Sequence, residues 1–196
     1  MPAGEGPLDP RSLFDTPKTD LWFEIGFGGG EHLAWQATAH PDIGFIGVEP
    51  FLNGVASLLR HVVDGNLENV RVLQGDARVA IARLPEASVG RLFVLFPDPW
   101  PKSRHNRRRV VGPTTLDVFA RALKDGAELR FATDDQGYLA WALRHVRAHP
   151  AFAWTARRAE DWRRRPADWP ETRYEAKAVA AARAPTFLTF VRRARG

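Results

Sequence analysis

Residues 21–30 read Leu-Trp-Phe-Glu-Ile-Gly-Phe-Gly-Gly-Gly, a short apolar run that passes directly into a glycine-rich turn. The run predicts a buried strand over Leu21–Ile25, and a segment of helical period follows from about residue 30. Glycines in such a turn allow positive φ and let a ligand approach the backbone, while free N–H groups at a helix start favour polar or anionic groups. The stretch therefore predicts a ligand-binding strand, turn and helix, with a plain tight turn as the alternative.

The spacing of the glycines narrows the choice of ligand. Gly26, Gly28 and Gly30 fit the pattern G-x-G-x-G. The dinucleotide-binding form of the turn needs a glycine or alanine where Glu31 stands. The spacing thus disfavours NAD.

The alternation of apolar runs and helical segments continues along the chain. Further runs occupy residues 45–48, 70–73, 92–96 and 129–132, with helical segments at about 30–39, 50–63, 77–84, 113–124 and 135–149. Two more strands are expected over 152–155 and 186–191, on either side of a Trp- and Arg-rich stretch at about 157–178. This order predicts an α/β fold: a mostly parallel seven-stranded sheet with helices on both faces and ligands at the carboxyl ends of the strands. We expect one domain over residues 21–196 and a flexible lead-in over residues 1–20.

Composition restricts the class of protein. The 196 residues include no cysteine, which excludes disulfides, thiolate zinc sites and cysteine nucleophiles. No secretory signal pattern and no apolar run of membrane-spanning length is present, so we expect a cytoplasmic protein without membrane contact. The first 100 residues carry 7 basic and 13 acidic side chains, whereas residues 101–196 carry 21 and 10. The two halves are therefore expected to face different partners.

Acidic side chains mark the ends of the first three predicted strands. Glu24 lies in the first strand, Glu49 follows the second, and Asp76 follows the third. A carboxylate in the second position can accept both hydroxyls of a ribose. Any one of the three could be a helix N-cap or a solvated strand end. Together they suit a cofactor with a ribose and a positive charge, such as S-adenosylmethionine, better than a pyrophosphate cofactor.

Residues 96–102 read Phe-Pro-Asp-Pro-Trp-Pro-Lys, directly after the fourth predicted strand. Because proline fixes φ and restricts the residue before it, Asp98 and Trp100 are held rigidly, as a preorganised carboxylate over a substrate would be. Residues 102–109 then supply five permanent positive charges and no acid. Beside a rigid loop this run predicts a phosphate-binding arm, with a solvated face as the alternative.

Two further patterns are less specific. Trp154, Trp162 and Trp169 interleave with arginines, and either packing or RNA contact would explain them. His145 and His149 have the i, i+4 spacing of metal ligands, but no acidic third ligand accompanies them. We expect no metal site.

Taken together, these motifs resemble bacterial tRNA (guanine-N7)-methyltransferases. The resemblance rests on Glu-Ile-Gly-Phe-Gly-x-Gly from Glu24, Gly47-x-Glu49, the segment from Phe96 to Arg109, Ala132-Thr-Asp134 and Thr172-Arg-Tyr-Glu175. It implies a class I methyltransferase (Rossmann-like) fold, S-adenosylmethionine as methyl donor with S-adenosylhomocysteine as product, and a variable-loop guanosine of tRNA as acceptor. We expect a monomer or homodimer without an obligatory protein partner.

The resemblance also implies roles for individual residues. Asp98 is the implied catalytic residue. The implied cofactor-binding residues are Glu24, Gly26, Gly28, Gly30, Glu49, Asp76 and Asp98. The implied substrate-binding residues are Lys102, Arg104, His105, Arg107, Arg108, Arg109, Asp134, Thr172, Arg173, Tyr174 and Glu175. Arg173 departs from the family, which commonly has lysine there, and this keeps the charge but changes the hydrogen-bonding geometry.

Three other functions are compatible with parts of this pattern. An amino-group methyltransferase also places an acid or amide, a proline and an aromatic after the fourth strand, but as Asp-Pro-Pro-Tyr rather than Asp-Pro-Trp-Pro. A noncatalytic RNA-binding subunit would retain the fold without needing Glu24, Glu49 and Asp98. A nicotinamide oxidoreductase is the remaining alternative.

Overall fold

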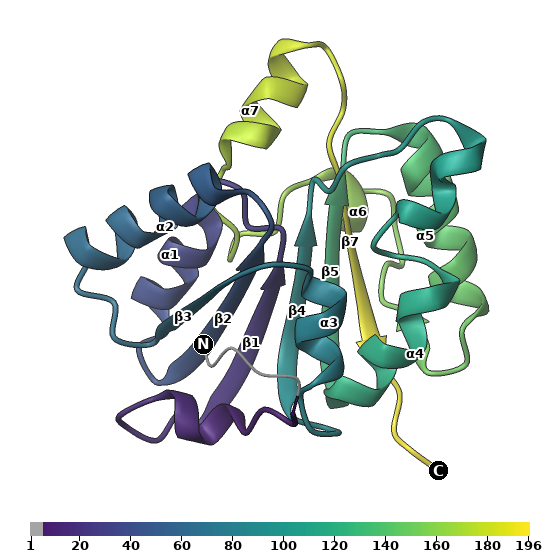
Figure 1. Cartoon of the computed structure of the whole chain (residues 1–196). Coiled ribbons are helices and arrows are strands. Elements are labelled where there is room, and N and C mark those ends of the chain that lie inside the picture. The colour runs from purple at the N-terminus through teal and green to yellow at the C-terminus, as the bar shows by residue number, and fades with distance from the viewer. Residues whose placement is uncertain (1–5) are drawn as a thin grey trace.

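Seven strands form one sheet in the computed structural model, which describes residues 6–196 with the side chain of Arg11 left out (Figure 1). The strands are β1 (Asp20–Ile25), β2 (Ile43–Glu49), β3 (Val70–Gln74), β4 (Val89–Leu95), β5 (Leu123–Thr133), β6 (Phe152–Trp154) and β7 (Thr186–Arg192). Their order is β3-β2-β1-β4-β5-β7-β6. Strands β1 to β5 pair in parallel, and β7 is antiparallel to both β5 and β6. The mostly parallel seven-stranded sheet is thereby confirmed.

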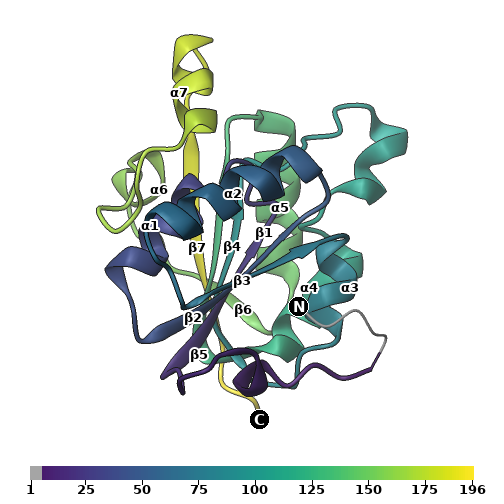
Figure 2. The same ribbon diagram turned by 60° about the vertical axis from the view of Figure 1, so that its left-hand side comes forward.

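Helices cover both faces of the sheet, as Figure 2 shows. The helices are α1 (Glu31–Ala39), α2 (Leu52–Asp64), α3 (Ala77–Ala82), α4 (Pro113–Ala122), α5 (Gln136–Ala148), α6 (Glu160–Arg163) and α7 (Arg173–Ala180), with 3-10 helices η1 (Pro10–Leu13) and η2 (Ser103–Arg108). Helices α1 and α2 pack on one face through Leu33 and Leu58. Helices α3, α4 and α5 pack on the other through Ile81, Phe119 and Val146. Because both faces are buried, successive residues of the central strands are apolar.

The structure differs from the sequence expectations at the chain start. Residues 1–5 lie outside the described residues. From there on, the expected lead-in contributes to the fold, since Leu8 and Phe14 are buried in the core and the Leu8 N–H donates to the carbonyl of Arg83 at 2.9 Å. The apolar residues of this segment have neither helical nor strand spacing and so predicted no element. Two of them, Leu8 and Phe14, nevertheless pack the segment against the core.

One strand begins earlier than the sequence predicts, and one stretch without a predicted element contains helices. Strand β5 begins at Leu123, six residues before the expected run. This early part contains Lys124, Asp125 and Gly126, and it pairs with β4 through a register irregularity between Val89 and Arg91, so no apolar run marks it. The stretch 157–178, which has no clean period, contains α6 and the start of α7. Helix α7 stands beyond the carboxyl ends of β1 and β4 (Figure 1).

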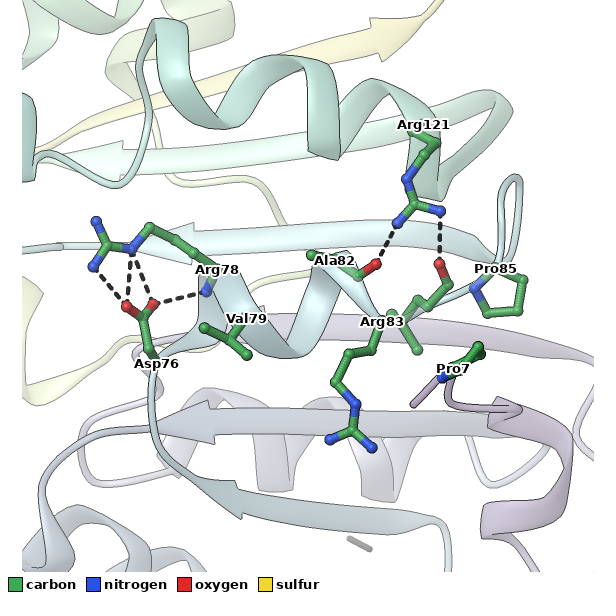
Figure 3. A pocket seen from close by; sticks show the side chains of 9 residues that line it. Pro7, Asp76, Arg78, Val79, Ala82, Arg83, Pro85 and Arg121 are labelled. Carbon is green, nitrogen blue, oxygen red and sulfur yellow. Dashed lines mark hydrogen bonds and ion pairs between the residues drawn. The ribbon is translucent and has the colours of Figure 1, made fainter. Parts of the chain in front are cut away.

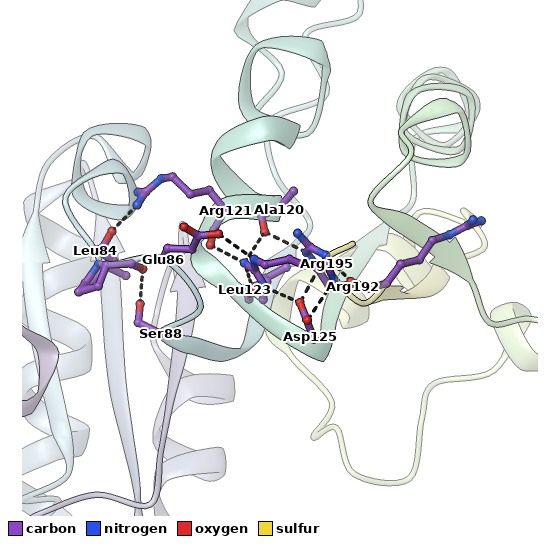
Figure 4. Close-up of polar contacts among 11 residues, drawn as sticks. Leu84, Glu86, Ser88, Ala120, Arg121, Leu123, Asp125, Arg192 and Arg195 are labelled. Carbon is purple, nitrogen blue, oxygen red and sulfur yellow. Dashed lines mark hydrogen bonds and ion pairs between the residues drawn. The ribbon is translucent and has the colours of Figure 1, made fainter.

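Arginine side chains lock the opposite, amino edge of the sheet. Arg195 donates to the carbonyls of Arg121 and Leu123 at 2.9 Å, where α4 ends and β5 begins, and to Glu86 at 2.8 Å (Figure 4). These bonds tie the C-terminal tail to the junction between α4 and β5. The C-terminal tail thus fixes the edge of the sheet that faces away from the ligand side.

Candidate active site at the carboxyl edge of the sheet

A cavity of about 370 Å³ opens at the carboxyl ends of β1, β2 and β4. It lies at the point where β1 has β2 on one side and β4 on the other, which is where open α/β sheets bind ligands. Its wall includes the glycine turn after β1, Glu49 at the end of β2, Asp76 after β3 and Asp98 after β4. Residues far apart in the sequence therefore place three carboxylates around one cavity.

The glycine turn and Glu49 form one rigid unit. Gly26 and Gly28 have φ of 67° and 56°, values that favour glycine. The Gly28 N–H donates to Oε2 of Glu49 at 2.9 Å, and the Phe51 N–H donates to Oε1 at 3.1 Å. Glu49 is only 5% exposed, yet each carboxylate oxygen keeps a lone pair that a ligand hydroxyl can use. The predicted ribose acceptor is thus oriented by backbone donors.

Glu24 lies beneath α1, away from the main cavity. Its Oε2 is 2.7 Å from Nδ1 of buried His32, and it lines a separate hollow of about 10 Å³. The Gln36 amide nitrogen lies 3.2 Å from Nε2 of His32 and donates to the carbonyl of Asp168. Because an amide N–H can only donate, we assign Nε2 of His32 as the acceptor and Nδ1–H as the donor to Glu24. His32 thereby holds the Glu24 carboxylate in a fixed orientation.

Asp76 caps helix α3 and binds Arg78. Its Oδ1 accepts from the Arg78 N–H at 2.9 Å, and its Oδ2 lies 2.6 Å from Nη2 of the same residue (Figure 3). Hydrogen bonding to the Arg78 side chain lowers the pKa of Asp76, so this carboxylate is ionised at neutral pH. Asp76 therefore brings a negative charge to the cavity wall, and this charge is paired with the guanidinium of Arg78.

A second hollow, of about 830 Å³, lies behind Asp76 on the outer side of α3 (Figure 3). Two of its arginines bind neighbouring backbone: Arg121 donates to the carbonyls of Ala82 and Leu84, and Nε of Arg83 donates to that of Gly6. Although larger, this hollow is not lined by the glycine turn, Glu49 or Asp98. The smaller cavity at the carboxyl edge is the better candidate site.

Asp98 projects from the rigid loop after β4. Phe96 and Trp100, on either side of it, have φ of 49° and 44°, a strained conformation for residues other than glycine. Asp98 is exposed and lines the cavity, and no group within residues 6–196 hydrogen-bonds to its carboxylate. The loop therefore presents an ionisable oxygen pair that is free to contact a ligand.

The basic run after Asp98 divides into two kinds of residue. Lys102, Arg104, Arg107 and Arg108 are exposed around η2, whereas Arg109 is only 6% exposed. The Arg108 guanidinium lies 4.7 Å from the centre of the Trp100 ring, and the half-buried ring of His105 lies 6.0 Å from it. The exposed members form a positively charged arm beside the cavity mouth.

Helix α7 closes the other side of the cavity. Thr172 caps it by accepting from the Glu175 N–H at 3.2 Å, and burial raises the pKa of Glu175, which pairs with Arg165 at 3.1 Å. The Tyr174 ring packs so closely on Gly28 that a Cβ there would lie 2.6 Å from it. Arg173 lies 3.5 Å from Glu31. These contacts make Tyr174 a wall of the cavity.

Comparison with known proteins bears on what this site does. A model of the family described as "Putative methyltransferase" matches residues 18–188. The chain is 58% identical to a Rhodospirillum rubrum protein named tRNA (guanine-N(7)-)-methyltransferase, over 98% of this chain and 76% of that one. The chain belongs to the tRNA (guanine-N(7)-)-methyltransferase family. It is also 54% identical to a protein of the same name from Azorhizobium caulinodans, over 94% of this chain and 80% of that one.

Solved structures place the chain in the class I methyltransferase fold. An rRNA methylase from Streptococcus thermophilus superposes with a TM-score of 0.62 at 11% identity, covering 94% of this chain and 92% of that one. The antibiotic-resistance methyltransferase Kmr gives 0.57 at 20% identity, covering 91% and 89%. At such identities the likeness concerns the fold alone, and it confirms the fold class predicted from the sequence.

Within this family member, the structure brings only part of the implied site together. Gly26, Gly28, Glu49, Asp76, Asp98, Arg108 and Tyr174 line the main cavity. Gly30 instead begins α1 at φ 83°, packed against Leu58. Asp134, at the end of β5, forms a 2.8 Å ion pair with Arg183. Thr172 and Glu175 support α7 from within, and Arg109 is buried behind the arm.

Some residues of the site escaped the sequence analysis. Arg78 and Phe51 line the cavity, and Gly54 of α2 packs directly on its glycine turn. The start of α7 did carry a signal, since Thr172-Arg-Tyr-Glu175 fits the S/T-x-x-E pattern of a helix capping box. A periodicity search misses it because the helix spans only Arg173–Ala180.

Two general features complete the description. Over the part of the chain that the structure describes, no three His, Cys, Asp or Glu side chains are grouped so that they could hold a metal ion. None of the helices in that part combines the length and apolarity needed to span a membrane.

Proposed function

We propose that this protein transfers a methyl group from S-adenosylmethionine to N7 of a guanosine in the variable loop of tRNA. The observation that carries the proposal is the cavity at the carboxyl edge, with Glu49, Asp76 and Asp98 in its wall, in a chain of the tRNA (guanine-N(7)-)-methyltransferase family. The exposed arm beside the cavity mouth supports a polyanionic acceptor.

The donor set of the cavity fits S-adenosylmethionine. Glu49 is held by two backbone N–H groups and retains lone pairs for the ribose hydroxyls. Glu49, Asp76 and Asp98 also favour a ligand with positive charge, which a sulfonium has and a pyrophosphate lacks. Glu24 reaches the ligand only from the neighbouring small hollow, which shares Gly26, Leu95, Phe96 and Tyr174 with the main cavity.

The reaction requires that guanine N7 be positioned against the methyl group and that the developing positive charge be stabilised, but it requires no removal of a proton from N7. When bound, S-adenosylmethionine supplies a methyl group on a sulfonium; N7 of guanine forms the new C–N bond with its in-plane lone pair as the C–S bond breaks, which leaves S-adenosylhomocysteine. Since N7 carries no proton, no base acts before the attack. Asp98 stabilises the positive charge that the purine gains and accepts hydrogen bonds from the guanine N1–H and amino group.

The remaining implied residues bind RNA or support the site. Lys102, Arg104, His105, Arg107 and Arg108 position the tRNA backbone, because guanidinium and ammonium groups are the usual phosphate ligands. Arg173 and Tyr174 act at the wall formed by α7. Asp134, once its ion pair with Arg183 opens, becomes a second acceptor for the guanine edge.

The experiment supplies labelled S-adenosylmethionine and unmodified tRNA to the purified protein. Label should enter the tRNA, and chain cleavage specific for N7-methylguanosine should map it to the variable loop. Label on an exocyclic amine would favour the amino-group methyltransferase instead. Cofactor-independent tRNA binding with no transfer would favour a noncatalytic RNA-binding subunit.

We also propose the setting in which this activity occurs. Residues 21–196, together with the segment 6–20 that packs on them, act as a single methyltransferase domain in the cytoplasm, where tRNA is available. The protein works as a monomer or homodimer without an obligatory protein partner. Size-exclusion chromatography with light scattering, with and without tRNA, measures the oligomeric state directly.

A further inference from the structure

Arg109 differs from the exposed cations that form the arm, which are Lys102, Arg104, Arg107 and Arg108. It is 6% exposed, its Nε donates to the carbonyl of Pro99 at 2.8 Å, and its Nη1 donates to the carbonyl of Gly137 at 3.3 Å. The guanidinium lies 5.0 Å from the centre of the Tyr138 ring and 5.3 Å from that of Trp141. The side chain thus joins the loop that carries Asp98 to the start of α5, and its charge points into the protein.

The loop that receives this bond has little else to hold it. Pro97, Pro99 and Pro101 have no N–H to donate, and within residues 6–196 Arg109 is the one residue whose side chain hydrogen-bonds to the backbone of residues 97–101. Two residues of the 96–101 loop are also strained, since Phe96 and Trp100 have positive φ. Strained conformations persist only where the surrounding structure holds them.

The support behind Arg109 is itself rigid. Tyr138 is fully buried and its hydroxyl oxygen accepts from the Val111 N–H at 2.9 Å. The indole nitrogen of Trp141 donates to the carbonyl of Val111 at 2.9 Å. Both rings are therefore fixed to the segment that leads from the arm into α4. A guanidinium between them can reach two carbonyls at once, which a lysine ammonium cannot do in the same plane.

We propose that Arg109 is a positioning residue: it holds the strained 96–101 loop so that Asp98 faces the bound guanine, and it does not contact RNA. The inference rests on the proposed function and refines it, because the family resemblance would place this residue with the RNA-binding arm. The geometry separates Arg109 from its neighbours, which are exposed. Losing it should displace Asp98 while leaving the arm charged.

The test compares Arg109→Lys and Arg109→Met with Arg107→Ala, a matched loss of one exposed arginine from the same arm. Under saturating tRNA and S-adenosylmethionine, both Arg109 variants should lose about 10- to 100-fold in kcat, as small misplacements of catalytic groups do. Their tRNA Kd and its salt dependence should stay near wild type. Arg107→Ala should weaken tRNA binding and flatten the salt dependence, with a smaller effect on kcat.

Hydrogen exchange gives a readout that needs no substrate. In both Arg109 variants, amides of the peptide 96–105 should exchange faster, while peptides from β1 and β4 keep wild-type rates. Faster exchange across the whole chain would mean that Arg109 has a folding role only. The Arg109→Lys variant keeps the charge and approximate length of the side chain, so it is the variant in which global unfolding is least expected. If Arg109→Met behaves like Arg107→Ala in tRNA binding and leaves the loop peptide unchanged, the proposal is wrong. If wild type methylates no tRNA but the loop effect is present, only the proposed function fails.

Discussion

Gly54 of α2 should be intolerant of even one added methyl group. Its α-carbon faces the glycine turn, and a Cβ built there lies 2.4 Å from the carbonyl oxygen of Gly28 and 2.9 Å from Cγ of Glu49. Both distances are well below van der Waals contact, and the first obstacle is backbone rather than a flexible side chain. Gly54→Ala must therefore push α2 and the glycine turn apart.

The two expected effects differ in size. Overpacking costs about 1–3 kcal/mol, and alanine recovers about 1 kcal/mol over glycine through helix propensity, so the free energy of unfolding should fall by at most about 2 kcal/mol. Separating the turn from α2 also breaks the bond from Gly28 N–H to Glu49, currently 2.9 Å. A hydrogen bond to a charged group contributes about 1.5–3 kcal/mol. If all of that were lost in ligand binding, Kd would rise about 10- to 150-fold.

Isothermal titration of S-adenosylhomocysteine into Gly54→Ala and wild type measures this directly. Asn53→Ala is the matched control, because it adds alanine to the same turn of α2 at an exposed position. The control should bind as wild type does and unfold at the same temperature or slightly higher. A Gly54→Ala protein that binds the ligand with wild-type affinity would refute the argument that this close packing shapes the site.

Three further outcomes are expected. Asp98→Asn should lower kcat on the order of 100-fold, because the positive charge that develops on the purine loses its partner. The affinity for S-adenosylhomocysteine, which has no sulfonium charge, should change little; equal turnover would remove Asp98 from the mechanism. Burial raises the pKa of Glu175, so the folded protein binds a proton at this carboxyl more tightly than the unfolded chain does. The free energy of unfolding should therefore rise as the pH falls through the raised pKa toward the ordinary glutamate value of about 4.3. Glu175→Gln lacks this gain, so thermal melts from pH 7 to 4.5 should shift the Tm difference in favour of wild type, and a constant difference would contradict the assignment. The tRNA affinity should fall with salt at a log–log slope of about −3 to −4, one increment for each exposed cation of the arm, while cofactor affinity changes little.

The sheet was predictable because its signals are local and repeated. Each central strand is buried on both faces, so apolar runs such as residues 21–25 and 92–96 stand out from their surroundings. The parallel order then follows from alternation with helices, and the carboxyl edge becomes the expected ligand side. Glu49 and Asp98 could be assigned to one cavity on this reasoning alone, since both follow strands that neighbour β1.

Side-chain direction was not predictable from the same signals. Glu24 looked equivalent to Glu49, but it pairs in register with Gly47, two residues before Glu49, so it lies deeper in the sheet beneath α1, where His32 holds it. Arg109 looked equivalent to Arg107 and Arg108. Its burial depends on Tyr138 and Trp141, which lie some thirty residues later in the chain. Contacts between residues so far apart in the sequence cannot be recognised from the spacing of neighbouring residues.

The charge asymmetry between the halves acquires a different meaning in the structure. Counting residues suggested that the basic half as a whole faces RNA, yet several of its arginines are engaged inside the protein: Arg130 and Arg192 pair with carboxylates, and Arg195 binds carbonyls at the amino edge. The cations left exposed beside Asp98 are few and lie on one arm. The expected salt slope counts the exposed cations of that arm rather than the net charge, which is why it is much shallower than the surplus of basic residues would suggest.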